Sequence, residues 1–337
     1  MALPSSAVSP DPTVGRPLAG IGSHPWVRFG VRRLGRLLVS LWVLVTASFL
    51  MIHVIPGDPV RAALGPIAPA DLVAAKRESL GLNDPLVVQY LHYLHDLFTG
   101  DFGTSWISQL PVSEVIAQRL PATLQLALLG FLVAVLIAVP VGVTVGVATR
   151  RGHGRRTELA FTTTSVVIGI IPDFLIGVGL VYVFGVSLGW LPVAGNDTPS
   201  AYVLPVLSLA IGPAAILSRI IRVEMVSVLG ADFVRTARAK RLPARTIYLR
   251  HALPNALTAS LTLGGLILGA MVASTVLVEN VFAWPGLGST IVQSILNKDY
   301  PVVQAIVLVY GVAVLLVNTI VDVALAVLDP RSMIREG

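Results

Sequence analysis

The sequence predicts an all-α membrane protein with six transmembrane helices. Its mean hydropathy is +0.81, and only 12% of its 337 residues are charged, about half the share found in ordinary globular domains. A helix needs about 20 apolar residues to cross the hydrocarbon core. Runs near or above that length lie at 34–55, 122–148, 159–187, 201–218, 256–281 and 302–327. This composition excludes a soluble enzyme.

The distribution of basic residues predicts the orientation. With both termini inside, most of the 24 lysines and arginines fall on the cytoplasmic side, including eight within 219–250. The outer segment 56–120 holds seven acidic residues against four basic ones. The net charge of +6 is therefore explained by membrane topology, and we expect a lipid membrane and no nucleic acid as the partner of these charges.

The first elements are a tail, a span and an outer cap. Residues 1–30 are rich in Ser, Pro and Gly and predict a disordered cytoplasmic tail. The apolar run that follows is too long for a signal-peptide core, so we expect an uncleaved span. The segment 56–120 predicts a small extracytoplasmic cap with amphipathic helices near 70–80 and 86–97, too short for a separate domain with a sizeable core.

Prolines lie inside several of the remaining runs. The fourth run is the shortest and contains Pro205 and Pro213, while Pro140 and Pro172 lie in the second and third. Each alone is ordinary in membrane helices, where neighbouring helices repair the lost hydrogen bonds. Together with frequent glycines, they fit helices that move against one another.

Charged residues within spans are costly and are functional candidates. Asp173 follows Pro172, where it either faces a cavity or is satisfied by neighbouring helices. Asn318 and Asp322 are four residues apart on one helix face, which favours structural pairing near the cytoplasmic end. Glu279 and Asn280 end the fifth run, where an interfacial position is expected.

The motifs of several chemistries are missing. None of the three lysines follows a glycine, so the sequence lacks the G-x-x-x-x-G-K-[ST] loop that cradles nucleotide phosphates. It contains no H-E-x-x-H motif and no cysteine, which excludes thiol chemistry. We expect no catalytic, cofactor or metal site, and a lone His53 near the outer end of the first span is expected to be structural.

The basic stretch "DFVRTARAKRL" at 232–242 is more specific than its charge. With "RHALPNA" at 250–256 it resembles the cytoplasmic loop of permease subunits of ATP-binding-cassette importers, in the dipeptide/oligopeptide branch. Matches extend over about 30–332, including "LGWLPVAG" at 188–195, "ENVFAWPGLG" at 279–288 and "KDYPVVQ" at 298–304. The long segment after the first span is similar to the B-type permease of that branch.

This resemblance implies a type I importer permease fold over 31–332, with a coupling loop at 229–256. It implies that the loop docks on a cytoplasmic ATPase through Asp232, Arg235, Thr236, Ala237, Arg238, Ala239, Lys240, Arg241, Leu242 and His251. Pro172, Asp173, Phe174 and Glu279 are candidates for the translocation path or gate.

The resemblance also implies an assembly in the bacterial cytoplasmic membrane. The implied partners are a C-type permease as heterodimer, two ABC ATPase subunits and an extracytoplasmic binding protein. ATP and Mg²⁺ would be used by the ATPases and no cofactor by this chain, which would be a peptide-translocating subunit and no enzyme.

One departure and two alternatives accompany this interpretation. Arg241 stands where the family usually has glycine, and a left-handed turn there would cost roughly 1–2 kcal/mol. We therefore expect Pro243 to end the helix instead.

The alternatives to an importer permease are an ion-coupled secondary transporter with Asp173 and Asp322 as coupling carboxylates, and a non-transporting scaffold or sensor.

Overall fold

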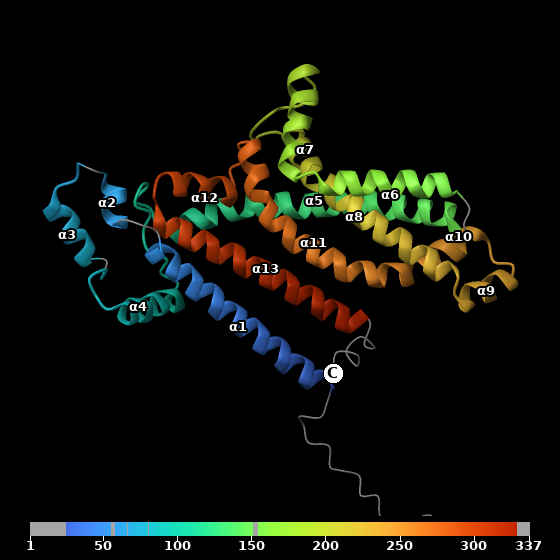
Figure 1. Ribbon diagram of the computed structural model, residues 1–337, viewed down its shortest axis with the longest axis horizontal. Helices are drawn as coiled ribbons and strands as arrows, with labels where there is room; N and C mark the ends of the chain where they lie inside the picture. The colour runs from blue at the N-terminus through green and yellow to red at the C-terminus, as the bar shows by residue number, and fades with distance from the viewer. Residues whose placement is uncertain (1–24, 55–57, 66, 80, 151–153, 329–337) are drawn as a thin grey trace, which may run out of the picture.

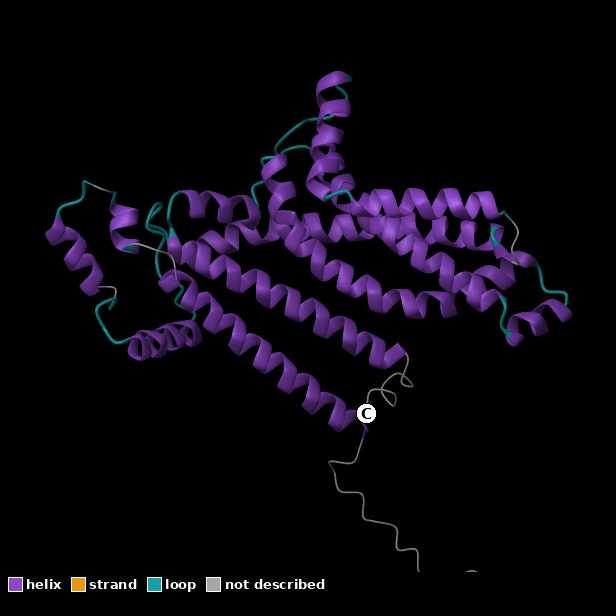
Figure 2. Ribbon diagram, in the orientation of Figure 1, coloured by secondary structure: helices purple, strands orange, loops and turns teal. Residues whose placement is uncertain are grey.

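The computed structural model describes residues 25–54, 58–65, 67–79, 81–150 and 154–328, and all its named elements are helices (Figures 1 and 2). In chain order they are α1 (Pro25–Val54), α2 (Pro59–Leu64), α3 (Ala70–Ser79), α4 (Leu86–Thr99), α5 (Val112–Ala148), α6 (Arg155–Ile170), α7 (Asp173–Leu180), the π-helix η3 (Val181–Ser187), the 3₁₀ turn η4 (Pro199–Tyr202), α8 (Val203–Leu229), α9 (Asp232–Ala239), α10 (Ala244–Thr246), the π-helix η5 (Ile247–Ala252), α11 (Leu253–Val281), α12 (Leu287–Leu296) and α13 (Tyr300–Leu328).

Five single helices are long and apolar enough to span a membrane, namely α1, α5, α11, α13 and α8 with its 3₁₀ turn. The third predicted span is not one continuous helix, because α6 and α7–η3 are bent by 94° at a break between them. If this bent pair is counted as one span, the total is six. The break lies at Ile171 and Pro172, both in extended conformation, because a residue before proline avoids the helical region. Pro140 and Pro213, in contrast, lie inside continuous helices.

Several predicted boundaries need correction. Helix α1 begins at Pro25, inside the predicted tail, and residues 1–24 lie outside the described residues. Helix α8 extends to Leu229, well past the predicted end at 218. In this extension Arg222 contacts Glu158 of α6 at 2.7 Å and donates to Thr149, which ties it to the neighbouring helices. Helix α12 was not predicted.

Helices α5 and α8 are packed closely because α5 presents a small residue at every fourth position. This ridge consists of Gly130, Ala134, Ala138, Gly142 and Gly146, all buried. A Cβ atom on Gly142 would lie 2.7 Å from Ile221 Cβ and from the Ser218 carbonyl oxygen of α8, so no larger residue fits there. Small residues at this spacing bring membrane helices into close contact.

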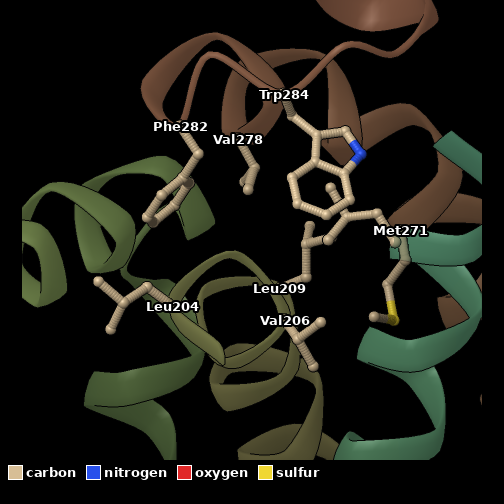
Figure 3. Close-up of a cluster of buried hydrophobic side chains, with 8 residues drawn as sticks. Leu204, Val206, Leu209, Met271, Val278, Phe282 and Trp284 are labelled. Carbon is tan, nitrogen blue, oxygen red and sulfur yellow. The ribbon is translucent and has the colours of Figure 1, made fainter. Parts of the chain in front are cut away.

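A core of large apolar side chains lies beside this ridge, near the start of α8 and the end of α11 (Figure 3). Trp284 and Phe282, which follow α11, pack with residues of α5, α8 and α11: Leu126, Leu204, Val206, Leu209, Met271 and Val278. The Trp284 indole donates to the Ala122 carbonyl at 3.1 Å, which satisfies its buried N–H.

Helices α1 and α13 lie side by side, with the predicted cap beyond one end (Figure 1). Arg33 of α1 is paired with Asp322 of α13, and Ser48 and Gln304 exchange hydrogen bonds at 3.2 Å near the other end. The cap helices α2–α4 and helix α9 lie at opposite ends of the long axis (Figure 1). The predicted outer cap and the predicted coupling loop therefore lie at opposite ends of the long helices.

Candidate functional site

Helix α9 forms within the predicted coupling loop and has two distinct faces. Val234 and Ala237 are buried against the rest of the chain. The other face carries Phe233, which is 46% exposed, and the exposed Ala239. Arg235 and Asp232 form a 3.1 Å ion pair, but their side chains are 74% and 93% exposed, so this pair contributes little. The exposed surface of α9 thus carries two apolar side chains, Phe233 and Ala239, about 120° apart around the helix axis with polar and charged residues between them.

The end of α9 is a left-handed turn at Arg241, which corrects the expectation that Pro243 would end the helix. Arg241 has φ of 56°, its N–H donates to the Arg238 carbonyl at 2.9 Å, and the Leu242 N–H donates to the Ala237 carbonyl at 3.3 Å. These two bonds form a Schellman motif, in which a left-handed residue satisfies the last helical carbonyls. Leu242 packs onto the cluster that contains Ala237, and this contact offsets the strain of a non-glycine residue.

A hydrophobic cluster joins α9 to three spans. Val234 and Ala237 pack with Met225 and Leu229 of α8, and with residues of η5 and α11: Ile247, Ala252 and Ala256. Val143 and Val147 of α5 pack against the same cluster. Tyr248 of η5 accepts a hydrogen bond from Arg150 at the end of α5, whose guanidinium also lies 5.5 Å from the Tyr248 ring centre. Helix α9 is therefore packed through one cluster against α5, α8 and α11.

These contacts revise the predicted docking residues. Ala237 faces the chain's own core, so it is not available to a partner's groove, whereas Ala239 is. Arg238 points back to donate to the Leu229 carbonyl at 3.5 Å, and His251 is half-buried in η5. The predicted docking residues did not include Phe233, although an exposed aromatic side chain in a short polar helix is a candidate anchor for a partner.

A second candidate site lies where the third span breaks. Pro172, Asp173 and Phe174 line a cavity of about 350 Å³, together with residues of α6, α8 and α11. The Asp173 carbonyl accepts a hydrogen bond from Ser208 at 2.6 Å, which ties the start of α7 to α8. Between the two open interpretations of Asp173, the geometry favours the one in which its side chain faces a cavity.

Glu279, the fourth predicted path residue, has a different environment. It is fully buried, so the expectation that it is interfacial is wrong. Its carboxylate accepts hydrogen bonds from the Thr123 hydroxyl at 2.7 Å and from the N–H groups of Gly288 at 2.7 Å and Ser289 at 3.1 Å. These amides belong to the first turn of α12, which Glu279 therefore caps from another helix. Thr123 accepts from Leu287 N–H at 2.8 Å and completes the cap.

Other polar residues near the ends of the spans have structural partners. The pairing of Asp322 with Arg33 agrees with the predicted structural role and leaves Asp322 compensated, which argues against its use as a coupling carboxylate. His53 contacts Gln89 of α4 at 3.0 Å and the Phe49 carbonyl at 3.1 Å, as expected for a structural histidine.

Hydrogen bonds join α2 to α3 within the cap, and others join the cap to the start of α13. Asp58 accepts from Val60 N–H and from Arg77, each at 3.0 Å. Desolvation acts to raise the pKa of Asp58, but these hydrogen bonds and the Arg77 charge outweigh it and lower the pKa. Asp299, buried before α13, accepts from the Ser105 hydroxyl at 2.5 Å and from Trp106 N–H at 3.0 Å.

The sequence matches two family descriptions. One, "Binding-protein-dependent transport system inner membrane component", covers residues 138–334, and the corresponding N-terminal family covers residues 26–127. The first contains α9 and the cavity at Asp173, and the second contains α1 and the cap.

Similar proteins support the same assignment. The chain is 40% identical to the glutathione transport system permease protein GsiC of Salmonella typhimurium, over 90% of this chain and 98% of that protein. It is 38% identical to GsiC of Escherichia coli K12 over the same shares.

An inward-facing structure of the MetNI methionine ABC transporter matches with a TM-score of 0.54 at 20% identity. The match covers 64% of this chain and 97% of that one, and it supports the type I importer permease fold. The chain therefore belongs to the family of binding-protein-dependent transport system inner membrane components, the membrane-spanning permease subunits of ABC importers.

Proposed function

We propose that this chain is the B-type permease of an importer that carries peptides across the cytoplasmic membrane. Family membership implies that it works with ATPase and substrate-binding subunits and is a transport subunit rather than an enzyme. The peptide cargo is supported by its similarity to glutathione permeases, since glutathione is a tripeptide.

The proposed assembly has one more permease and a fixed orientation. A C-type permease would form the other half of the path, and the binding protein would dock on the cap formed by α2–α4. Both termini would be cytoplasmic, on the same side as α9. The two ATPases would consume ATP and Mg²⁺, while this chain would bind no cofactor.

The observation that carries the proposal is the position of α9. This helix exposes Phe233 and Ala239 at the end of the molecule opposite the cap, while its buried face is fixed to α5, α8 and α11. A groove in an ATPase subunit can receive such a short amphipathic helix. When two ATPases close on ATP, the attached spans would be pulled together and would reorient the path.

Substitutions on the exposed face of α9 test this role. Loss of an aromatic interface anchor typically costs on the order of 2 kcal/mol, which is about a thirtyfold loss of affinity. We expect Phe233→Ala to weaken co-purification of the ATPase to that degree, and Ala239→Trp to block docking sterically. ATP-driven uptake of glutathione and tri-alanine by the reconstituted complex should fall in parallel.

The control places the same bulk on the other side of the membrane. Ala74 is exposed on α3 of the cap, so Ala74→Trp should leave ATPase co-purification unchanged. Unaltered co-purification and uptake in both α9 variants would refute the docking role. Solute transport by the purified single chain without nucleotide would instead favour an ion-coupled transporter.

A further inference from the structure

The cavity at the break in the third span lies near the midpoints of two apolar spans. Its walls include Gly212 and Ile216, which lie near the midpoint of the span Pro199–Leu229, and Ala270 and Met271, near the midpoint of Ser260–Val281. The broken span closes a third side with Asp173. A solute that crosses between the outer cap and the cytoplasmic end must pass this depth.

Asp173 is the acidic group of this cavity. Its side chain is half-buried, and it forms no ion pair with any residue that the structure describes. One carboxylate oxygen faces Gly212, where an added Cβ atom would lie 3.0 Å away. Ser274 of α11 is the other residue with a polar side chain in the lining, and the remaining wall is apolar. No positively charged side chain among the described lining residues therefore balances a charge on Asp173.

A carboxylate at this depth requires a compensating group, since charges inside membrane proteins pair or face a functional cavity. Its place as the first residue of α7 gives some stabilisation from the helix dipole, but a dipole is weaker than a full opposite charge. A carboxylate only accepts hydrogen bonds, and an ammonium group donates up to three. A cationic group that enters the cavity would supply the opposite charge that the described residues do not.

We propose that Asp173 recognises a cationic group of the transported solute, of which the α-ammonium of a peptide is the leading example. This inference rests on the proposed peptide transport and adds a specificity-determining residue to it. A cavity of about 350 Å³ has room for one end of a peptide. The backbone of Gly212 and the hydroxyl of Ser274 would lie beside the bound ammonium group.

The natural lack of cysteine allows a local test of charge. Ser274→Cys places a thiol in the cavity wall of the fully assembled, reconstituted transporter. Its modification by the cationic trimethylammonioethyl methanethiosulfonate is compared with that by the anionic sulfonatoethyl reagent, read from the mass of this chain. We expect the cationic reagent to react faster, and adding Asp173→Asn should lower this preference about tenfold, because one nearby charge is removed.

Matched variants show whether the preference for the cationic reagent comes from Asp173 or from the overall charge of the protein. Asp197 is an exposed carboxylate in the loop after η3, so Asp197→Asn should leave the preference unchanged. Asp173→Glu should retain it. A preference unaffected by Asp173→Asn would overturn the proposal, as would a thiol at 274 that neither reagent reaches, since the cavity would then be closed by a partner subunit.

Protection experiments identify the source of the cation. Tri-alanine supplied with its binding protein and ATP should slow the modification of the Ser274→Cys variant. It should not slow the modification when Asp173→Asn is added to that variant. Protection by NiCl₂ alone would assign the site to a metal cation, and equal protection by N-acetyl-tri-alanine would refute recognition of an ammonium.

Uptake measurements distinguish peptide transport by the complex from recognition of an ammonium group by Asp173. If the unaltered complex transports tri-alanine with ATP but Asp173→Asn transports it equally well, the peptide function stands and the inference fails. If no peptide is transported, the proposed cargo fails, while the reagent preference still reports whether the cavity attracts cations.

Discussion

At residue 241 a long cationic side chain occupies a conformation that favours glycine. The strain of this left-handed residue is retained because two hydrogen bonds and the packing of Leu242 fix the turn. The sequence alone showed that a glycine was missing. It could not show that the turn would survive, because that depends on the hydrophobic cluster beneath α9, which is built from distant segments.

A glycine at this position should stabilise the end of α9. Arg241→Gly removes a conformational cost of about 1 kcal/mol, so the midpoint of thermal unfolding of the purified complex should rise. Arg241→Ala keeps the cost while removing the charge, and it should not raise the midpoint. Equal shifts in the two variants would mean that charge repulsion, and not backbone strain, determines the stability of this turn.

Residues with the same predicted role can have different environments. Asp173 and Glu279 are both acidic groups in predicted spans, yet Asp173 lines a cavity and Glu279 is buried with three hydrogen-bond donors. Sequence spacing does not distinguish them, since the amides that Glu279 accepts from belong to α12, a helix that was not predicted.

At the scale of elements, hydropathy predicted where the spans lie better than how they are shaped. The runs that became α5, α11 and α13 were found because length and composition determine them. The 94° bend between α6 and α7 was not, although Pro172 marked its place. Proline limits the local backbone, but packing on α8 sets the direction in which the chain continues.

The cap that Glu279 provides to α12 predicts a strong effect of its removal. Glu279→Ala leaves the amides of Gly288 and Ser289 buried without acceptors, at a cost on the order of 3 kcal/mol. We expect a marked loss of thermal stability of the purified complex and weaker packing of α12. Glu279→Gln, which retains an acceptor, should be intermediate.

Asn280 provides the comparison for this variant. It is exposed beside Glu279, and its amide donates to Val276 and Gly288 carbonyls. Asn280→Ala should cost far less stability than Glu279→Ala. Similar small losses for both would contradict the capping role, and would return Glu279 to the candidates for the path.

At the scale of the whole molecule, the proposed transport requires the cap, the cavity and α9 to follow one another along the length of the spans. The cap lies at one end and α9 lies at the other (Figure 1). The cavity at Asp173 is lined by residues near the midpoints of two spans. The distribution of basic residues predicted the separation of the two ends. A cavity at Asp173 was one of two open interpretations of the sequence, but its other wall residues could not be predicted, because they come from the separate helices α6, α8 and α11.

The central claim is that α9 is held by a separate ATPase on the cytoplasmic side, and a single cysteine tests it most directly. Ala239→Cys is made in this cysteine-free chain, with Ser79→Cys on the exposed surface of the cap as its comparison. Ala239→Cys should cross-link to the ATPase subunit and resist a membrane-impermeant maleimide added outside intact cells, while Ser79→Cys should react with that reagent. Labelling of Ala239→Cys from outside, with no cross-link to the ATPase, would contradict the account.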